Sequence, residues 1–472
     1  MDESAPPTAS HERPASAAVE DASQARRSET RRRALAFALV FAAALGVRLL
    51  CLSDVRGEVG AVQTAVTENY KQQARLLVEN GIASFFRPGS ATNDPELLGH
   101  PPGYPFVLAL VYELFGESDA ATQILQIICD SLAAALVLLI ALELLPFGAA
   151  VVAGSIAALA PQFCWNCVLL LPDTLAVPAI LLAVLLLLRA NKGHALLKAL
   201  AAGALVGASC WLRANALLLA PFVALAAAPF LFARGERVRA SLALVAGALV
   251  AIAPLTVRNA VVFGHFIPVS LGAGQTLVEG VGDYDPEQKF GLPDTDVELQ
   301  RQEAEAKVRP EYASSLFSPD GIERDRERTR RALSVMRAHP FWFAGVMARR
   351  AASMLRLERV PLASGANVSE GWTRPLRLLV RAAQRLFVTA IFLPLYILGL
   401  LLLAHARRTR ALAALVAVPL YYLCVQSALH TEYRYVLAIH YLLFIAAAAG
   451  LYQLYQMARA ATTRLKLQRA SR

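Results

Sequence analysis

Acidic, histidine and arginine side chains stand beside the apolar runs of this 472-residue chain, and these residue types could do chemistry. A carboxylate can take the proton from an attacking hydroxyl group. Arginine can clamp a phosphate through paired hydrogen bonds and stabilise its charge as it departs. Together they favour transfer of a group from a phosphate-bearing donor to a hydroxyl acceptor. The candidates are Asp54, Glu58, Glu68, Asp94, Glu96, His100, Asp173, Arg213, Arg258, His430, Glu432 and Arg434.

Each of these residues also has a purely structural explanation. An arginine at a helix end can lay its stem along apolar surface and keep its charge in the headgroup region. His100 precedes Pro101 and Pro102, so it either assists a leaving group or holds that turn. The structural explanation is weaker for the whole set, because other basic residues already occupy the opposite ends of the apolar runs. Several ionisable groups at one end of membrane spans indicate a site.

The elements that must position these residues are apolar helices. Hydrophobic residues make up 56% of the chain and the mean hydropathy is +0.47, which leaves too few polar residues to cover a soluble domain. We therefore expect an all-α integral membrane protein, a bundle of about ten transmembrane helices. The runs that reach or approach the length of a bilayer are 34–52, 120–143, 147–164, 170–189, 195–211, 214–232, 239–256, 384–404, 411–428 and 434–457.

The distribution of charge predicts the topology. The net charge of +10 does not indicate nucleic-acid binding, because Lys and Arg collect on the cytoplasmic side of membrane proteins. Basic segments 189–194, 234–239 and 405–410 fall on the same side as both basic tails if ten spans are threaded through the membrane. We expect both termini in the cytoplasm and the candidate residues on the outer face. The Ala-, Leu- and Arg-rich composition favours a bacterial inner membrane, with a site facing the periplasm.

The chain divides into two tails and one membrane domain. Residues 1–33 are predicted to be a disordered basic cytosolic tail and residues 458–472 a second basic cytosolic tail, on either side of a transmembrane domain over 34–457. Two long outer segments, 53–119 and 258–381, interrupt the spans. Helical spacing predicts amphipathic helices on the membrane over 104–115 and 341–357. No Asp, Glu and His cluster has tight metal-ligand spacing, so neither a metal nor a cofactor is expected.

Several motifs occur in an order that resembles a known superfamily. They are Gly99–Pro105 with its continuation to Gly116, Leu171–Leu175, Gly207–Arg213, Pro254–Asn259, His339-Pro340 and Glu432–Tyr435. Their order and spacing resemble the GT-C superfamily of membrane glycosyltransferases, above all the protein O-mannosyltransferases and the bacterial lipid A aminoarabinose transferases. The resemblance covers the chain from about residue 34 to residue 457.

The resemblance implies an inverting glycosyltransferase that uses a sugar linked to polyprenyl phosphate. The acceptor would be a hydroxyl of a glycolipid, a polysaccharide or a protein at the outer face, among membrane lipids. Candidate ligands of the donor phosphate are Arg213, Arg258 and Arg434. Supporting roles fall to His100, Tyr70, Asp173, Glu432 and Tyr435.

The general base is the point at which the sequence departs from the family. In these relatives an acidic residue opens a short helix in the first outer loop, followed by a Tyr and, four residues later, an Ala. Tyr70 and Ala74 fit this spacing, but Val66 and Thr67 occupy the positions expected for the acid. Glu68 is the first choice for the base, followed by Glu58 and Asp54. The departure leaves an inactive or repurposed homologue open.

Two other classes of membrane protein compete with this interpretation. A transporter or lipid-sugar flippase commonly has repeated halves and broken spans near the midplane, and the sequence shows neither clearly. A polysaccharide polymerase or ligase would share the donor and the topology. A long first outer loop with embedded amphipathic helices favours the transferase.

The topology can be tested by labelling introduced cysteines with a membrane-impermeant thiol reagent. Cysteines at Asn93 and Asp294 should react from outside the cell, because both positions lie in the outer segments. A cysteine at Gly235 should react only after the membrane is permeabilised. Labelling of Gly235 from outside would overturn the topology.

Overall fold

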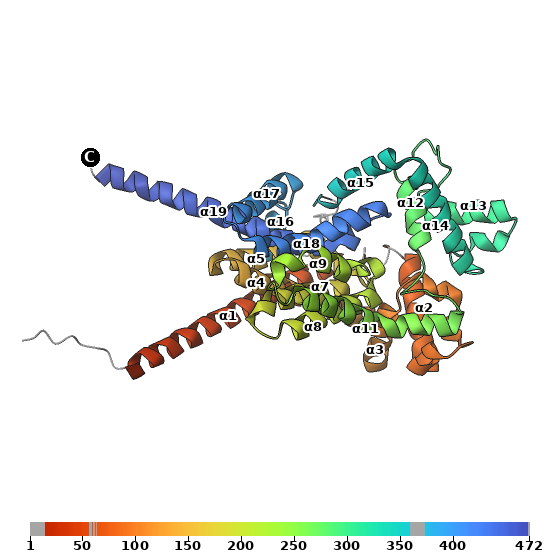
Figure 1. The fold of residues 1–472 in the computed structure, drawn as a ribbon, viewed down its shortest axis with the longest axis horizontal. Helices are drawn as coiled ribbons and strands as arrows, with labels where there is room; N and C mark the ends of the chain where they lie inside the picture. The colour runs from red at the N-terminus through yellow and green to blue at the C-terminus, as the bar shows by residue number, and fades with distance from the viewer. Residues whose placement is uncertain (1–14, 56–58, 60–61, 63, 359–372, 471–472) are drawn as a thin grey trace, which may run out of the picture.

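A computed structural model gives the fold of residues 15–55, 59, 62, 64–358 and 373–470. All regular elements in these ranges are helices, which pack into one elongated bundle (Figure 1). Seven of the described helices are long and apolar enough to cross a membrane. They are α1 (Ala15–Val55), α4 (Asp119–Leu144), α7 (Asp173–Arg189), α8 (Ala195–Leu212), α11 (Arg237–Phe263), α18 (Thr409–Val425) and α19 (Leu437–Ala470). The predicted all-α, multi-pass membrane fold is confirmed.

Three of the ten predicted spans are broken. Helices α16 (Arg374–Gln384) and α17 (Thr389–His405) pass the same test together but are bent by 62°, so they form an eighth span if counted as one. Run 147–164 divides into α5 (Phe147–Leu159) and α6 (Pro161–Asn166). Run 214–232 divides into η6 (Ala214–Ala216), α9 (Leu219–Ala226) and α10 (Ala228–Leu231). Pro161 and Pro229 stand in the first turns of α6 and α10, where proline, lacking an N–H, begins a helix more readily than it continues one.

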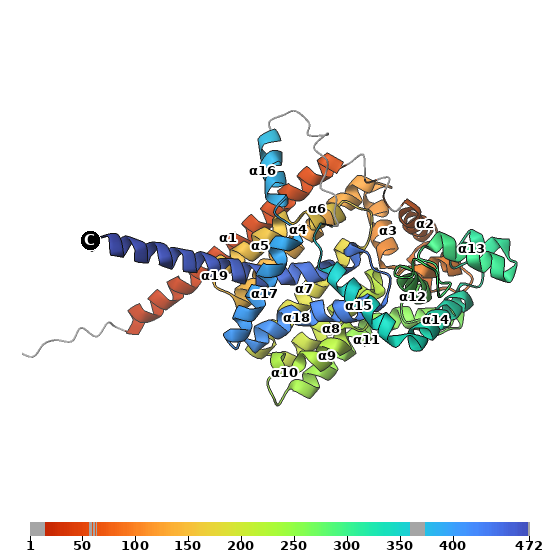
Figure 2. The same ribbon diagram turned by 90° about the horizontal axis from the view of Figure 1, so that it is seen from above.

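The two outer segments form one end of the molecule. The first contains α2 (Thr64–Asn80), the short turns η2 (Ile82–Phe86), η3 (Ala91–Asn93) and η4 (Pro95–Gly99), and α3 (Gly103–Phe115). The second contains α12 (Ala273–Gly282), α13 (Asp296–Lys307), η7 (Pro310–Ala313), α14 (Gly321–Ala338) and α15 (Pro340–Met354). Helices α3 and α15 match the two predicted amphipathic helices. Both views place α2 and α12–α14 at the end opposite the start of α1 and the end of α19 (Figures 1 and 2).

The predicted tails are more ordered than expected. Helix α1 begins at Ala15 and α19 continues to Ala470, so the described parts of both tails are helical. The prediction of disorder is wrong for residues 15–33, because Ala, Glu and Arg are good helix formers and Glu29 pairs with Arg33 one turn later at 2.5 Å. Residues 1–14 and 471–472 lie outside the described residues.

Glycines allow α8 and α11 to pack with their backbones in contact. A Cβ atom on Gly203 of α8 would lie 1.8 Å from the carbonyl oxygen of Leu244, and one on Gly247 of α11 would lie 2.1 Å from that of Leu200. Close packing of small residues replaces the hydrophobic effect as the force between helices in lipid. The contact aligns the outer ends of both helices, where Arg213 and Arg258 lie.

A buried ion pair joins the first and last spans. Arg48 of α1 places Nε 2.5 Å from Oδ2 of Asp130 in α4 and donates a hydrogen bond to the Ala158 carbonyl of α5. The hydroxyl of Tyr441 in α19 donates to the other oxygen of Asp130. Both charges are almost completely buried, so neither is tolerable without the other. The pair fixes four helices against one another.

Helix α12 docks on the loop before α19 through a second polar contact. Asp283, at the end of α12, accepts from Nδ1 of His430 at 3.0 Å and pairs with Arg350 of α15 at 3.2 Å. The backbone N–H of His430 donates to Thr276 of α12 at 2.7 Å. Burial alone would lower the pKa of His430, but its hydrogen bond to Asp283 and the charges of Asp283, Glu279 and Glu432 raise it. Through this contact the second outer segment packs against His430, four residues before Arg434.

The packing of α8 on α11 predicts a difference between two glycines. Gly203→Ala should destabilise the protein by about 1–3 kcal/mol, because the new methyl group overlaps the Leu244 carbonyl. Gly46→Ala, also within a spanning helix, meets nothing within 4 Å and should be neutral or stabilising by up to about 1 kcal/mol. Thermal unfolding of both variants in one detergent measures the difference, and equal melting temperatures would show that α8 and α11 are not in backbone contact.

The docking of α12 should depend on pH. Because the pKa of His430 is raised in the folded protein, its ion pair with Asp283 is fully formed at pH values below the ordinary histidine pKa and is lost as the pH rises through the raised value. Hydrogen exchange in α12 should therefore accelerate on going from pH 6 to pH 9, after correction for the intrinsic rate. His430→Gln should reduce the pH dependence to the part that Glu279 of α12 contributes, because burial raises the pKa of that carboxyl to about 7. A corrected rate in the wild type that is constant with pH would contradict the ion pair.

Candidate functional site

A buried carboxylate with two arginines forms the centre of the candidate site. Asp173 is the first residue of α7, where the preceding Pro172 and the positive end of the helix dipole favour an acidic residue. Its side chain is only 3% exposed. The Nε atom of Arg213 lies 3.1 Å from one carboxylate oxygen, and Nη1 of Arg434 lies 3.7 Å from the other. Three segments far apart in the sequence therefore meet at one buried charge.

Glu432 and Tyr435 complete this group, which we call the Asp173 cluster (Asp173, Arg213, Glu432, Arg434 and Tyr435). Arg434, in η10 (Tyr433–Val436), pairs with Glu432 at 2.8 Å, and the Arg213 guanidinium lies 4.1 Å from the centre of the Tyr435 ring. Burial would raise the pKa of Glu432, but its hydrogen bond with Arg434 and the charge of that guanidinium lower it. The cluster thus contains two ionised arginines and a second carboxylate that is partly open to solvent.

Tyr70 and His100 extend the cluster toward the first outer segment. The Tyr70 ring is fully buried and its centre lies 5.1 Å from that of His100. Burial raises the pKa of the Tyr70 phenol, so it keeps its proton and can donate a hydrogen bond. Burial, then the charges of Arg213 and Arg434, lower the pKa of His100 to about 4. His100 is therefore a neutral imidazole at neutral pH.

Several polar atoms of this region are buried without a hydrogen-bond partner among the described residues. They are the hydroxyl oxygen of Tyr70, both carboxylate oxygens of Asp173 and Nη1 of Arg434. The contacts of Asp173 with its arginines are ion pairs without hydrogen-bond geometry. Leaving such groups unsatisfied costs about 1–3 kcal/mol each, so the arrangement suits a polar ligand that bonds to them.

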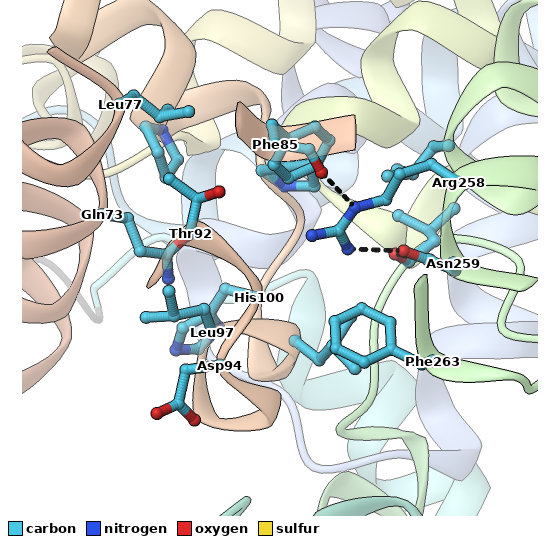
Figure 3. A pocket seen from close by; sticks show the side chains of 15 residues that line it. Gln73, Leu77, Phe85, Thr92, Asp94, Leu97, His100, Arg258, Asn259 and Phe263 are labelled. Carbon is cyan, nitrogen blue, oxygen red and sulfur yellow. Dashed lines mark hydrogen bonds between the residues drawn. The ribbon is translucent and has the colours of Figure 1, made fainter. Parts of the chain in front are cut away.

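Arg258 lies apart from the cluster, although the sequence predicts that it converges with Arg213 and Arg434. Its three guanidinium nitrogens donate to the carbonyl of Phe85 and to the side-chain oxygens of Asn93 and Asn259. These contacts tie α11 to the first outer segment. Arg258 lines a cavity that has Phe263 beside it and His100 and Asp94 across from it (Figure 3). Of the three candidate phosphate ligands, Arg213 and Arg434 therefore meet at Asp173, whereas Arg258 bonds to other residues.

Glu68 does not face the cluster, so its predicted position is wrong. Its side chain is 60% exposed and pairs at 2.7 Å with Arg75, which also binds Glu117 at 2.6 Å. The reason is helical geometry. Positions two apart in a helix point about 200° apart, so burial of Tyr70 turns Glu68 outward.

Of the other two candidate bases, Asp54 lies in a different part of the structure from the Asp173 cluster, and Glu58 is not described. Asp54 is buried and pairs with Arg377 and Arg381 of α16, which ties the end of α1 to the bent span. It is not part of the Asp173 cluster. Glu58 lies outside the described residues, so its role stays a prediction.

The sequence analysis missed residues of the second outer segment. Asp283 and Glu279 of α12 act on His430, two residues before Glu432, but their stretch reads only as an acidic, turn-rich loop. Burial raises the pKa of Glu279 to about 7. The only feature of the sequence that could have led to Asp283 and Glu279 is the spacing of His430, Glu432 and Arg434, and this spacing does not indicate which residues bind His430. In the described part of the chain, no group of three or more His, Cys, Asp or Glu residues is placed to hold a metal ion.

Comparisons with known proteins agree with this arrangement. Residues 99–258, which include His100, Asp173 and Arg213, match the family model "Dolichyl-phosphate-mannose-protein mannosyltransferase". No curated protein matches the chain significantly.

Solved membrane structures share the fold. The archaeal oligosaccharyltransferase AglB from Archaeoglobus fulgidus, in complex with an inhibitory peptide and a dolichol-phosphate, aligns with a TM-score of 0.51 at 17% identity. That alignment covers 92% of this chain and 52% of AglB. A crystal structure of the Archaeoglobus fulgidus enzyme with Zn and sulfate aligns with a TM-score of 0.50 at 16% identity, over 90% of this chain and 49% of that one. ArnT from Cupriavidus metallidurans, bound to undecaprenyl phosphate, aligns with a TM-score of 0.35 at 16% identity, over 88% and 76% of the two chains.

The chain spans about half the length of AglB, so its fold corresponds to one part of that protein. The resemblance to the GT-C superfamily that the motifs predict is thereby confirmed by the family model over 99–258 and by the fold. The chain is therefore an all-helical, multi-pass membrane protein that shares its fold with AglB, and its residues 99–258 match a family model of membrane mannosyltransferases.

Proposed function

We propose that the protein transfers a sugar from a polyprenyl-phosphate donor to a hydroxyl group of a glycolipid, polysaccharide or protein, with inversion at the sugar carbon. The observation that carries this proposal is the Asp173 cluster. Two arginines converge on one buried carboxylate, and polar atoms of Asp173, Arg434 and Tyr70 have no hydrogen-bond partner among the described residues. A phosphate next to an acceptor hydroxyl has the donors and acceptors that these atoms lack.

Arg213 and Arg434 would bind the donor phosphate. Planar guanidinium groups form paired hydrogen bonds with phosphate oxygens, and these bonds strengthen as the leaving group gains charge. Tyr70 can donate one more hydrogen bond from its protonated phenol. Arg258 would then hold the first outer segment in place rather than contact the phosphate, since all three of its nitrogens are already bonded.

Asp173 replaces Glu68 as the proposed general base. When phosphate oxygens take the two arginines, the Asp173 carboxylate is released to accept the proton of the acceptor hydroxyl. The acceptor oxygen then bonds to the anomeric carbon from the face opposite the phosphate, and the carbon–oxygen bond to the phosphate breaks. Its electron pair leaves with the phosphate, whose added charge the arginines neutralise. Glu432 is the alternative carboxylate of the same cluster, and Glu58 stays a candidate from the first loop.

An apolar cavity supports a lipid-linked donor. It is lined only by apolar side chains of α7, α8, α9, α10, α11 and α18. Its nearest α7 residue to the cluster is Ile180, two turns after Asp173. A polyprenyl chain with its phosphate at the cluster would reach this cavity by lying along α7. The AglB structure described above holds a dolichol-phosphate, a lipid of the same class.

The proposed orientation puts the cluster at the outer face of a bacterial inner membrane and both termini in the cytoplasm. The end of the molecule that contains α2 and α12–α14 would then face the periplasm. The start of α1 and the end of α19 lie together at the opposite end, as this orientation requires (Figure 2).

The proposal predicts opposite results for two carboxylate variants. Asp173→Asn keeps the side-chain shape but removes the base, so transfer should fall by about two to four orders of magnitude. Glu68→Gln should keep activity within about threefold, because Glu68 faces solvent. Consumption of undecaprenyl-phosphate sugars by the protein in liposomes, with acceptors from each of the three classes, measures transfer.

Binding of undecaprenyl phosphate and the melting temperature serve as controls for folding. Both should be close to wild type in the Glu68 variant, and Asp173→Asn should still bind the phosphate through Arg213 and Arg434. An inactive Glu68→Gln beside an active Asp173→Asn would return the base to the first loop. If the wild type neither binds undecaprenyl phosphate nor consumes any donor, the transferase proposal fails.

A further inference from the structure

A basic cavity lies at the end of the bundle opposite the Asp173 cluster. Helix α7 is 17 residues long, from Asp173 to Arg189, which separates its two ends by about 25 Å. At the far end, the last turn of α4, the turn η5 (Ala190–Lys192) and the connection between α17 and α18 line a cavity that is open to solvent. All of these elements end or begin apolar spans, so the cavity lies at the level of lipid headgroups.

Positive charge in this cavity exceeds negative charge. Four cations, Lys192, Arg407, Arg408 and Arg410, line the cavity together with one carboxylate, Glu143. Glu143 is already paired, with Lys192 at 2.5 Å and with Arg189 of α7 at 2.8 Å. None of the three arginines forms an ion pair within the described ranges, and the charge of the already paired Glu143 is the one that acts on Arg410.

Helix capping accounts for part of this arrangement but not for all of it. Arg408 donates to the Leu144 carbonyl at the end of α4, and Arg410 donates to the Leu188 carbonyl near the end of α7, where cations are favoured. The Nε atom of Arg410 is nevertheless buried with no hydrogen-bond partner. The Arg407 side chain makes no hydrogen bond or ion pair in the described structure, and its backbone is left-handed with φ of 52°, which favours Gly or Asn. Both arginines have donors left for a ligand.

The geometry points to a phosphate ligand, and we infer that this cavity binds the phosphate of an anionic membrane-lipid headgroup in the leaflet opposite the candidate site. Guanidinium groups match phosphate oxygens in shape and charge, and basic cavities between spanning helices commonly hold acidic headgroups. The lipid would neutralise charge that the protein leaves unpaired. Leu401, six residues before Arg407, is exposed on α17, the apolar helix that leads to the cavity, so an acyl chain can lie along this helix.

Three probes distinguish binding of a lipid headgroup from binding of a free phosphate ion. Free inorganic phosphate offers the same oxygens but has no acyl chains to lie along α17. Phosphatidylcholine has the acyl chains and the phosphodiester, but its choline cancels the charge. Phosphatidylglycerol combines both features and is therefore the probe of choice.

The test uses the full-length protein in nanodiscs of equal phosphatidylglycerol and phosphatidylcholine content, with retained lipid counted by native mass spectrometry. The wild type should retain phosphatidylglycerol in preference to phosphatidylcholine. In the double variant Arg407→Gln/Arg410→Gln, the ratio of retained phosphatidylglycerol to retained phosphatidylcholine should fall about tenfold. The control variant Arg234→Gln/Arg239→Gln removes the same charge from two exposed positions, one just before α11 and one in its first turn. This control should keep the preference for phosphatidylglycerol within about twofold of the wild type.

A second measurement guards against misfolding, because Arg410 also caps α7. Arg407→Gln alone removes a side chain without hydrogen bonds or ion pairs, so its melting temperature in phosphatidylcholine should equal that of the wild type. Added phosphatidylglycerol should raise the melting temperature of the wild type but not that of Arg407→Gln. The inference is overturned if the wild type shows no preference, if the two double variants lose it equally, or if inorganic phosphate alone gives the same stabilisation as phosphatidylglycerol.

Discussion

The interaction on which the candidate site depends is the burial of Asp173 between two arginines. A single buried charge in a bundle of apolar helices is costly, and removing one partner of such a pair typically costs about 3–5 kcal/mol. Arg213 at the end of α8 and Arg434 before α19 must therefore reach the start of α7 in any stable packing. The charge that we propose as the general base is the same charge that brings these three segments of the chain together.

The completeness of pairing distinguishes scaffold from site elsewhere in the protein. Arg48 and Asp130 satisfy each other with help from Tyr441 and from backbone carbonyls, so their role is to hold α1, α4, α5 and α19 together. Arg258 is likewise fully bonded, although to neutral oxygens, and joins α11 to the first outer segment. At the Asp173 cluster, polar atoms are left without partners. Buried atoms without partners also occur at Gln162, Tyr396 and Arg328, so the distinguishing feature of the Asp173 cluster is that both members of one ion pair, Asp173 and Arg434, have such atoms facing each other.

The same distinction explains what could be predicted from the sequence. Hydrophobic run length predicts the all-α membrane fold, and the motif order predicts that Asp173, Arg213 and Arg434 belong to one site, because both properties are carried by local sequence. The outward turn of Glu68 depends on which face of α2 is buried, and that is decided by Tyr70 packing against His100. Phe85 and Asn93, which bind Arg258, lie more than a hundred residues from it, as does Asp283 from His430. These partners stand in segments without a motif, so no local pattern indicates them.

Helix α7 connects the Asp173 cluster with the basic cavity at the opposite end of the bundle. Its acidic start and basic end both match the helix dipole, so each terminal charge is stabilised by the helix as well as by its ion-pair partners. The start of α7 gathers arginines around a carboxylate, and its end pairs Arg189 with a Glu143 that Lys192 already shares. Phosphate-bearing lipids in the two leaflets would therefore meet one helix at opposite ends. Because α7 is packed within the bundle along most of its length, a headgroup bound at one end would restrain the helix that presents Asp173 at the other, although Pro178 removes one hydrogen bond from the first turns of the helix.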